Sequence, residues 1–424
     1  MLQLNNMNRI DKIFKAYDIR GVYPDEVNGK IADKIVRAFV KTGKIKNLVI
    51  GRDNRPSSRG LFKAICEGIS AKGVDIIDIG LTTTPMFYYA VVKLNSDGGI
   101  MVTASHNPLK YNGFKIVKKG AEPADKNDLD KIKKIVKSGQ LAGDSGKSGS
   151  IIKKDMLDDY IDNILSFCHP ESINKFRINI DTSNGTAKEV VSKLASKLPI
   201  KLTQKKILPK DADLGVVFDR DGDRLLFIDK KRGEIDPDLI AAILIRYYFG
   251  NSGKIIYTAA SSKIIKKEAE SSGNEAICSK VGHSHVEESM AKEEAVFGCE
   301  PSGHYYFKNI YCVDSPLVVF LKILEIMSQT KMSLADLTNQ FEKYYKEEIK
   351  IKIKNTTQAS LFKKIRSFGR TGKISHFDGL TVEYDNWWFN LRASNTEQVM
   401  RLTIEADTKE LLKEKIKELT PFLP

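Results

Sequence analysis

Short runs of β-branched residues alternate along this chain with longer amphipathic stretches. The segments between the runs, such as 30–44 and 61–72, carry apolar residues at helical spacing. The runs themselves have the length and composition of strands, and they lie at 47–51, 75–80, 99–103, 178–181, 214–218 and 254–258. Alternation of this kind is typical of α/β units with largely parallel sheets. The chain is therefore expected to be an α/β protein.

The last 80 or so residues follow a different pattern. Segments 381–395 (TVEYDNWWFNLRASN) and 399–406 (VMRLTIEA) alternate like antiparallel strands, which predicts an α+β piece. Composition changes at 138–150, 233–238 and 344–355 divide the chain further, and 138–150 (SGQLAGDSGKSGS) has the composition of a linker or flexible loop. These changes predict four domains, three of similar α/β type and a smaller α+β one, at 1–150, 151–236, 237–345 and 346–424.

Several classes of protein are disfavoured by composition. No apolar run reaches the ~18 residues of a membrane span, and the N-terminal segment lacks the apolar core of a signal peptide. The five cysteines are scattered and form no CxxC pair, which fits a reducing cytoplasm. We therefore expect a cytoplasmic protein with no membrane partner.

The net charge of +14 raises the question of an acidic ligand. Most of the basic residues are lysines, and they are interleaved with glutamate in helical-looking segments such as 261–268, 341–354 and 409–418. A charge run of this type usually forms a solvated surface, and no RNA-binding signature is present. The favoured interpretation is a lysine-rich surface without a nucleic-acid partner, and the alternatives are an acidic substrate or a polyanion.

Four polar clusters each follow a strand-like run. Ligands of open α/β sheets bind beyond the carboxyl ends of the strands, so loops from four segments are expected to converge on one cleft. The first cluster is 103–108 (TASHNP), followed by Lys115 in 111–115 (YNGFK). Ser105 is a candidate covalent carrier of a group such as phosphate, with Lys115 as acid/base or anion clamp. The alternative is a turn whose Ser and Asn side chains cap the backbone.

The second cluster is 219–224 (DRDGDR). Asp219, Asp221 and Asp223 stand at alternate positions and can direct three oxygens at one hard cation such as Mg²⁺. A calcium loop of the EF-hand type is excluded because Arg224 and Lys230 occupy the positions where that loop needs Gly and Glu. The alternative, a turn rich in capping aspartates, would leave the three carboxylates repelling each other.

The two remaining clusters are suited to polar ligands. Segment 298–304 (GCEPSGH) offers Glu300, Ser302 and His304 to a hydroxyl-rich ligand, and segment 392–397 (RASNTE) has the composition of a phosphate cradle. The alternative for 298–304 is an ordinary turn, and the alternative for 392–397 is a polar loop between two strands. Weaker candidates are Arg20, which could equally form a surface ion pair, and His283, which could equally be structural.

Taken together and in this order, the clusters resemble the α-D-phosphohexomutase superfamily. FKAYDIRG, ASHNPLKYNGFK and LRASNTE are most similar to its phosphomannomutase/phosphoglucomutase branch. The resemblance runs over nearly the whole chain and implies four domains around a central cleft, the last one resembling the TATA-box-binding protein. It also implies an isomerase that transfers a phosphoryl group within its substrate.

The resemblance assigns a role to each candidate. Ser105 would carry the phosphoryl group, and with Asp219, Asp221 and Asp223 it would hold Mg²⁺. Glu300 and Ser302 would bind the sugar hydroxyls. The phosphate that is not transferred would be held by Arg392, Ser394, Asn395 and Thr396. Arg20, Lys115, Arg224, His283 and His304 would line the cleft, with Lys115 and His304 as acid/base candidates.

The chain departs from the family pattern in three places. Only 199–213 lies where the family places an extra strand and helix before the metal loop, which questions the regularity of the second domain. Segment 259–263 (AASSK) replaces a frequent substrate-contacting lysine, and Gln398 replaces a frequent proline. The departure at 259–263 weakens the expectation that this chain has the same substrate preference as other members of the family.

The predicted activity interconverts the 6-phosphate and 1-phosphate of mannose, and of glucose as a further substrate. A hexose 1,6-bisphosphate would be both intermediate and activator, and the protein would be a monomer or homodimer. A phosphoglucosamine mutase is the alternative within the family. Outside it, the alternatives are a Mg²⁺-dependent phosphatase and a polyanion-binding protein.

Overall fold

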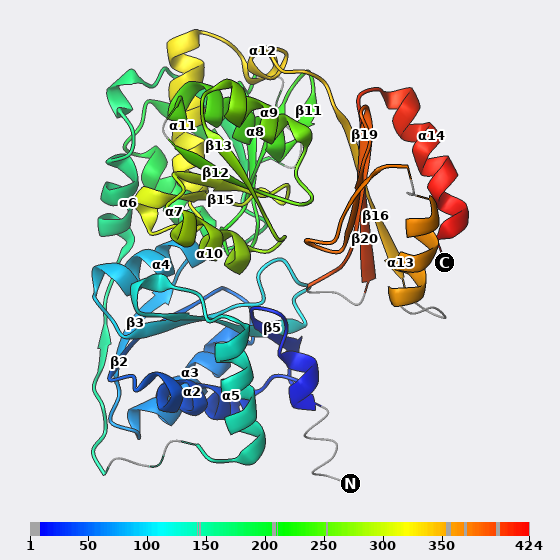
Figure 1. Cartoon of the computed structure of the whole chain (residues 1–424). Coiled ribbons are helices and arrows are strands. Elements are labelled where there is room, and N and C mark those ends of the chain that lie inside the picture. Colours follow the sequence, from blue (N-terminus) through cyan, green and yellow to red (C-terminus); the bar gives the residue numbers. More distant parts are fainter. Residues whose placement is uncertain are drawn as a thin grey trace. The chain divides into compact units, whose positions relative to one another are not determined.

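The computed structural model describes residues 9–141, 143, 146–205, 209, 211–251, 253–352, 358–368, 371–395 and 399–423. The chain forms two compact units, each built from two stretches of sequence (Figure 1). Unit 1 contains Met1–Glu234 and His304–Lys331, and unit 2 contains Ile235–Gly303 and Met332–Pro424. The predicted linker at 138–150 is described only in part, because 142, 144 and 145 lie outside the described residues.

The first sheet of unit 1 has six strands in the order β1-β5-β4-β2-β3-β6. β1, β5 and β4 pair antiparallel, and β4, β2, β3 and β6 pair parallel. The strands are β1 (Ile19–Val22), β2 (Asn47–Arg52), β3 (Asp75–Leu81), β4 (Gly98–Val102), β5 (Tyr111–Lys118) and β6 (Ile151–Lys153). The strands predicted at 47–51, 75–80 and 99–103 are confirmed. Because β6 pairs with β3, this sheet includes residues beyond position 150.

Amphipathic helices cover this sheet on both faces (Figure 1). They are α2 (Gly29–Gly43), α3 (Ser58–Ser70), α4 (Thr84–Lys93) and α5 (Lys126–Ser138). α2 begins where the Asn28 side chain accepts a hydrogen bond from the Ile31 N–H, which satisfies a free donor of the first turn. Its buried face, including Ile35 and Phe39, packs into the same core as the strand residues Leu48 and Ile100. This is the pattern expected when a helix buries one apolar stripe.

The second sheet of unit 1 has five strands in the order β11-β10-β9-β7-β8. They are β7 (Phe176–Asp181), β8 (Ile200–Thr203), β9 (Leu214–Phe218), β10 (Leu225–Asp229) and β11 (Gly233–Ile235). The short 199–213 stretch supplies β8 and, in its described part, no helix, yet β8 pairs regularly with β7. The other elements of unit 1 are α6 (Leu157–Leu165), α7 (Ala187–Ala195), β15 (Tyr305–Phe307) and α11 (Pro316–Thr330).

Unit 2 combines an α/β part with an antiparallel sheet. In the first part β12 (Lys254–Thr258) lies parallel to both β13 (Glu275–Ser279) and β14 (Phe297–Cys299). Its helices are α8 (Pro237–Leu244), α9 (Lys263–Ser271), α10 (His283–Glu293) and α12 (Leu334–Thr338). The second part has the strand order β16-β20-β19-β18-β17. Its elements are β16 (Tyr345–Lys352), α13 (Gln358–Phe368), β17 (Lys373–Ser375), β18 (Leu380–Glu383), β19 (Trp387–Ala393), β20 (Val399–Ala406) and α14 (Lys409–Leu419). The α+β prediction for the C-terminal piece is confirmed.

One of the lysine-rich segments is not helical. Segment 341–354 was expected to resemble the helical segments 261–268 and 409–418, but it contains the strand β16, which lies at the edge of its sheet beside β20. The sequence of β16, YKEEIKIK, places Ile349 and Ile351 on the same face of the strand. Burial of these alternate side chains outweighs the helix propensity of Lys and Glu at the edge of the sheet. The other two segments form α9 and α14 as predicted.

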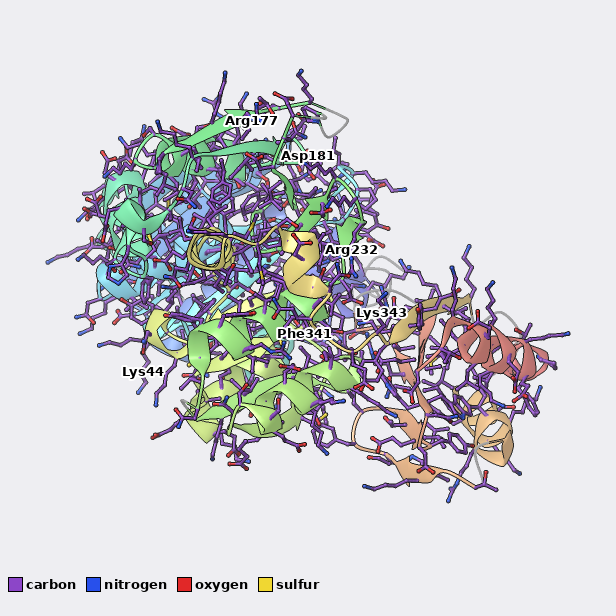
Figure 2. The ribbon with its side chains drawn as sticks, turned by 90° about the horizontal axis from the view of Figure 1, so that it is seen from above. Lys44, Arg177, Asp181, Arg232, Phe341 and Lys343 are labelled. Atoms are coloured by element: carbon purple, nitrogen blue, oxygen red, sulfur yellow. The ribbon has the colours of Figure 1, made fainter. Side chains whose placement is uncertain are left out.

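Many of the charged side chains lie on the surface of their unit. Lys44, Arg177 and Lys343, labelled in Figure 2, are all exposed. None of the five cysteines forms a disulfide. In the part of the chain that the structure describes, no helix has the length and apolarity needed to cross a membrane.

A buried ion pair joins the two parts of unit 2. The Lys346 ammonium on β16 contacts the Asp238 carboxylate at the start of α8, and the Ser262 N–H donates to the same Asp238 oxygen over 2.8 Å. Lys346→Met is expected to destabilise unit 2 by about 3–5 kcal/mol, because it leaves a buried carboxylate without its cation. Both tryptophans lie in β19, so urea unfolding followed by tryptophan fluorescence reports on this unit. The exposed Lys352→Met is the control, and equal midpoints for the two variants would contradict the prediction.

Candidate active site

The four predicted loops all begin where a strand ends. The Ser105 loop follows β4 and the Asp219 loop follows β9, both in unit 1. The Glu300 loop follows β14 and the Ser394 loop follows β19, both in unit 2.

The Ser105 loop is a strained turn held by backbone contacts. Ser105 is buried and has a φ of +48°, in the left-handed region that non-glycine residues rarely adopt. Its N–H donates to Thr103 Oγ1 over 2.8 Å, and its Oγ lies 3.3 Å from His106 Nδ1. Burial and neighbouring cations lower the pKa of His106 to about 2, so this imidazole is neutral. It therefore brings no positive charge to Ser105.

Arg20 is bound to this same loop. Its Nη1 donates to Asn107 Oδ1 over 3.0 Å, and its Nη2 lies 2.5 Å from Asp18 Oδ2. The side chain is buried, so this is not the surface ion pair that the sequence left open. Burial disfavours the charged guanidinium, but Asp18 and nearby acidic groups raise the pKa of Arg20 overall. Arg20 therefore brings a fixed positive charge to the Ser105 loop.

The three aspartates of the 219–224 loop form one acidic group. Asp219, Asp221 and Asp223 have carboxylate oxygens that lie within 4.8 Å of one another. One oxygen of each, Asp219 Oδ2, Asp221 Oδ1 and Asp223 Oδ1, is buried and has no hydrogen-bond partner among the described residues. Burial and the two neighbouring carboxylates raise the pKa of Asp219 well above its ordinary value. Three neighbouring carboxylates, each with one buried oxygen that lacks a described hydrogen-bond partner, fit a divalent cation, which would relieve their repulsion.

Two further contacts set the position of the aspartates. Gly222 has a φ of +69°, which allows the loop to turn sharply between Asp221 and Asp223. Thr84, at the start of α4, donates from its N–H to the Asp221 carbonyl over 2.8 Å and from its Oγ1 to Asp221 Oδ2 over 2.9 Å. The start of α4 and the loop after β9 therefore meet at the acidic group.

Lys115 on β5 forms ion pairs with two of these carboxylates. Its Nζ contacts Asp223 Oδ2 and lies 3.4 Å from Asp221 Oδ2. Burial alone would lower the pKa of Lys115, but Asp223 and Asp221 raise it well above its ordinary value. In this arrangement Lys115 is a fixed ammonium, suited to binding an anion rather than to accepting a proton.

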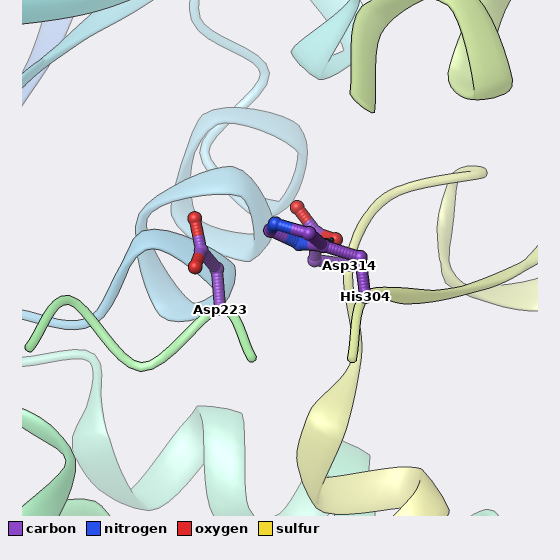
Figure 3. A group of neighbouring side chains, drawn as sticks. All are labelled: Asp223, His304 and Asp314. Atoms are coloured by element: carbon purple, nitrogen blue, oxygen red, sulfur yellow. Dashed lines mark hydrogen bonds and ion pairs between the residues drawn. The ribbon is translucent and has the colours of Figure 1, made fainter. Parts of the chain in front are cut away.

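His304 forms a dyad with Asp314, and Asp223 lies next to it (Figure 3). His304 Nδ1 lies 2.7 Å from Asp314 Oδ1, and Arg224 Nε donates to His304 Nε2 over 2.9 Å. Because an arginine N–H can only donate, Nε2 holds the lone pair and the Nδ1 proton faces Asp314. Burial would lower the pKa of His304, but Asp314 and Asp223 raise it above its usual range. The imidazole thus accepts a hydrogen bond at Nε2 from Arg224 and faces Asp314 with Nδ1.

In unit 2, Glu300 and Ser302 lie on the loop after β14. Both are at least partly buried, and Glu300 Oε1 accepts a hydrogen bond from the Gly282 N–H over 2.8 Å. Gly282 precedes His283 at the start of α10, and His283 Nδ1 lies 3.7 Å from Glu287 Oε1. Ser302 Oγ is buried with no hydrogen-bond partner among the described residues, so it can donate to a ligand hydroxyl. The adjacent Cys299 is buried.

Arg392, Ser394 and Asn395 lie at the end of β19 in the same unit. Asn395 Nδ2 donates to the Val281 carbonyl over 2.8 Å, and the Val281 N–H donates to Asp378 Oδ2 over 2.9 Å. The phosphate-cradle segment and the His283 segment are therefore held together. Burial lowers the pKa of Arg392. Its Nε is buried with no described hydrogen-bond partner, so it can donate to an anion. Thr396, the last residue of this predicted set, lies outside the described residues.

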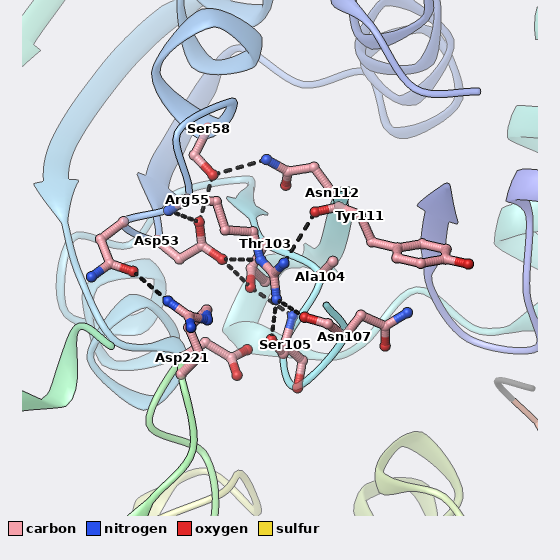
Figure 4. Close-up of polar contacts among 12 residues, drawn as sticks. Asp53, Arg55, Ser58, Thr103, Ala104, Ser105, Asn107, Tyr111, Asn112 and Asp221 are labelled. Carbon is pink, nitrogen blue, oxygen red and sulfur yellow. Dashed lines mark hydrogen bonds and ion pairs between the residues drawn. The ribbon is translucent and has the colours of Figure 1, made fainter. Parts of the chain in front are cut away.

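Sequence reasoning missed the residues that support the site from a distance. Asp314 orients His304, Asp378 holds the Val281 N–H, and the buried Asp53–Arg55 pair holds the Ser105 loop (Figure 4). Only Asp53 and Arg55 carried a usable signal, because both follow the predicted strand 47–51 at its carboxyl end.

The α/β sheets, the buried serine turn and acidic group of unit 1, and the hydroxyl-suited and anion-suited loops of unit 2 are together those expected of a phosphohexomutase. Models for the phosphoglucomutase/phosphomannomutase family match three parts of the chain: the alpha/beta/alpha domain I at 11–143, the alpha/beta/alpha domain III at 236–344 and the C-terminal domain at 338–420. The chain belongs to this family, and it is an isomerase of the intramolecular phosphotransferase type.

Individual relatives are similar over almost their full length. The chain is 31% identical to a phosphomannomutase of Vibrio cholerae, over 97% of this chain and 98% of the relative. It is 31% identical to a phosphomannomutase of Methanocaldococcus jannaschii, over 96% of both. Among solved structures, a phosphoglucomutase/phosphomannomutase family protein of Burkholderia thailandensis superimposes with a TM-score of 0.86 at 27% identity, covering 97% of this chain and 96% of the other.

Proposed function

We propose that this phosphohexomutase interconverts mannose 6-phosphate and mannose 1-phosphate, and accepts the glucose phosphates as further substrates. Ser105 carries the phosphoryl group, and a hexose 1,6-bisphosphate is the intermediate and activator. The observation that carries the proposal is that unit 1 contains both the buried Ser105 turn and the acidic group. The similarity to two phosphomannomutases supports mannose as the sugar.

The acidic group is proposed to hold Mg²⁺ through Asp219, Asp221 and Asp223, whose orphaned oxygens fit a hard cation. When bound, the ion neutralises charge that develops on a transferring phosphoryl group. Lys115, Arg20 and Arg224 add fixed positive charge from the protein. Electrostatic stabilisation of this kind accounts for most of the catalysis of phosphoryl transfer.

In the proposed first step the sugar hydroxyl oxygen attacks the phosphorus of phosphoserine 105. The Ser105 Oγ–P bond breaks, the new P–O bond forms, and the hydroxyl proton passes to a general base. His304 is the better of the two predicted bases, because its Nε2 lone pair, which here accepts from Arg224 Nε, can take the proton when that hydrogen bond opens, whereas Lys115 is held protonated. The reverse transfer, from the other phosphate of the bisphosphate to Ser105 Oγ, completes the isomerisation.

The other predicted residues are assigned to the remainder of the substrate. Glu300, Ser302 and His283 would bind sugar hydroxyls, and Arg392, Ser394, Asn395 and Thr396 would hold the phosphate that is not transferred. The oxygens of a phosphate monoester carry negative charge and can accept two parallel hydrogen bonds from a buried guanidinium. The four domains at 1–150, 151–236, 237–345 and 346–424, a cytoplasmic location and a monomer or homodimer complete the proposal.

Asp314→Asn tests the role of the dyad. The variant is expected to lower kcat at least about 10²-fold with KM changed by less than about threefold, because an amide does not hold His304 in the proton-accepting tautomer. Steady-state kinetics with mannose 1-phosphate measure this. The exposed Asp211→Asn is the matched control and should retain wild-type kcat. An Asp314→Asn enzyme with wild-type kcat would remove His304 from the mechanism.

The proposed substrate is tested by comparing kcat/KM for the 1-phosphates of mannose, glucose and glucosamine, with the corresponding bisphosphate supplied. The expected order places mannose first, glucose next and glucosamine last. A preference for glucosamine would favour the phosphoglucosamine mutase alternative. Release of free phosphate without isomer formation would indicate a phosphatase instead.

A further inference from the structure

A single buried guanidinium contacts four backbone carbonyls in the segment 105–111. Arg55 follows β2 in the segment before α3, and its side chain and that of Asp53 are both 0% exposed. Its Nη1 donates to the carbonyls of Pro108 (2.8 Å) and Tyr111 (3.1 Å). Its Nη2 donates to the carbonyl of Asn107 (2.7 Å) and contacts that of Ser105 (Figure 4). Nε donates to Asp53 Oδ2 over 3.0 Å, so every N–H of the guanidinium is used.

Asp53 extends the same network to the other side of Ser105. Its Oδ2 also accepts from Thr103 Oγ1 over 2.8 Å, and Thr103 Oγ1 in turn accepts from the Ser105 N–H. Its Oδ1 accepts from Ser58 Oγ and from the Arg55 N–H. Ser105 is thus fixed at both backbone ends, its N–H through Thr103 to Asp53 and its carbonyl to Arg55.

These contacts explain how Ser105 maintains a φ of +48°. A left-handed non-glycine residue costs free energy and persists only where its surroundings enforce it. Arg55 makes no described contact with the Ser105 side chain, and Ser105 Oγ meets only His106 Nδ1 in the described hydrogen bonds. Arg55 therefore acts on the backbone and leaves the hydroxyl available.

We propose that Arg55, neutralised by Asp53, is a positioning residue that holds Ser105 Oγ in the orientation needed for phosphoryl transfer. The inference rests on the proposed role of Ser105 as carrier. A lysine at this position would keep a charge for Asp53, but it lacks the planar fork that reaches four carbonyls. Since a misplacement of about 1 Å can cost roughly 10²-fold in rate, the effect is expected in kcat rather than in substrate affinity.

The test uses Arg55→Lys in the full-length protein. The expected result is a fall in kcat of about 10²-fold with KM within about threefold of wild type. Thr103→Val, which removes only the hydroxyl between Asp53 and the Ser105 N–H, is expected to give a smaller loss of the same kind. Addition of low-millimolar guanidinium to Arg55→Ala should restore part of kcat, and methylammonium should restore less. Arg37→Lys, at a partly exposed ion pair on α2, is the matched control.

A purely structural role is distinguished by Ile65→Val, a core substitution on α3 chosen to lower Tm. This variant is expected to retain wild-type kcat at a temperature where it is folded. The inference is wrong if the kcat of Arg55→Lys equals that of wild type. It is also wrong if Ile65→Val lowers kcat by as much as Arg55→Lys does.

A second measurement does not depend on activity. Hydrogen exchange of the peptide covering 103–111 should be at least about tenfold faster in Arg55→Lys than in wild type, and unchanged in Arg37→Lys. A wild-type protein that never carries phosphate on Ser105 would contradict the proposed function, while this exchange result would still report on the turn. Equal exchange in Arg55→Lys and wild type would contradict the inference alone.

Discussion

Ser105→Ala is expected to reduce the mutase rate at least about 10⁴-fold. The substitution removes the only proposed acceptor of the phosphoryl group, and the cost of losing a covalent nucleophile is generally of this size or larger. The same variant should show no phosphate increment in its intact mass, whereas wild type incubated with a hexose 1,6-bisphosphate should gain one. Measurement by a coupled assay and by mass spectrometry gives two independent readouts.

The control for this prediction is Ser196→Ala, an exposed hydroxyl at the end of α7. Its rate and phosphate increment should equal those of wild type. Because Ser105 is held in its turn by its backbone N–H and carbonyl, and its Oγ meets only His106 Nδ1 among the described hydrogen bonds, the alanine variant is expected to fold normally. A phosphate increment that persists in Ser105→Ala would place the carrier elsewhere.

Asp219→Asn is expected to have the next largest effect, a fall in kcat of about 10²–10³-fold. Asp219 supplies one of the three orphaned oxygens, and asparagine removes its charge while keeping an acceptor for the Asp223 and Arg224 N–H groups. Isothermal titration with Mg²⁺ in the absence of sugar should show weaker binding. Titration measures the proposed metal role without relying on turnover.

Although Asp219→Asn is expected to lower kcat, it should stabilise the metal-free protein. Burial and the charges of Asp221 and Asp223 raise the pKa of Asp219, which means that its ionised form destabilises the metal-free protein at neutral pH. Asp219→Asn is therefore expected to raise Tm in the presence of a chelator, and to lose the increase in Tm that Mg²⁺ gives wild type. The exposed Asp211→Asn should change neither value. A metal-free Asp219→Asn protein that is less stable than wild type would contradict this account of the acidic group.

The sequence predicted the features that depend on local pattern. The buried strands have apolar β-branched runs, and each candidate loop stands directly after such a run, so both the sheets and the positions of Ser105 and Asp219 could be anticipated. β16 was missed because a strand at a sheet edge can carry Lys and Glu on its exposed face, which resembles a helical charge run.

The supporting residues could not be predicted in the same way. Asp314 bonds to His304 ten positions earlier, and Arg55 bonds to carbonyls about fifty positions later. Contacts of this kind depend on how the strands are ordered in the sheet and leave no periodic trace in the sequence. They also fix the tautomer of His304 and the backbone of Ser105, two properties on which the proposed chemistry depends.

A single-turnover chase tests the central claim most directly. Wild-type protein is labelled on Ser105 with ³²P, freed of excess label, and mixed with mannose 6-phosphate and Mg²⁺. The label is expected to leave the protein and to appear in mannose 1,6-bisphosphate. Label that is released as inorganic phosphate, or that remains on the protein, would contradict a phosphoserine mutase mechanism.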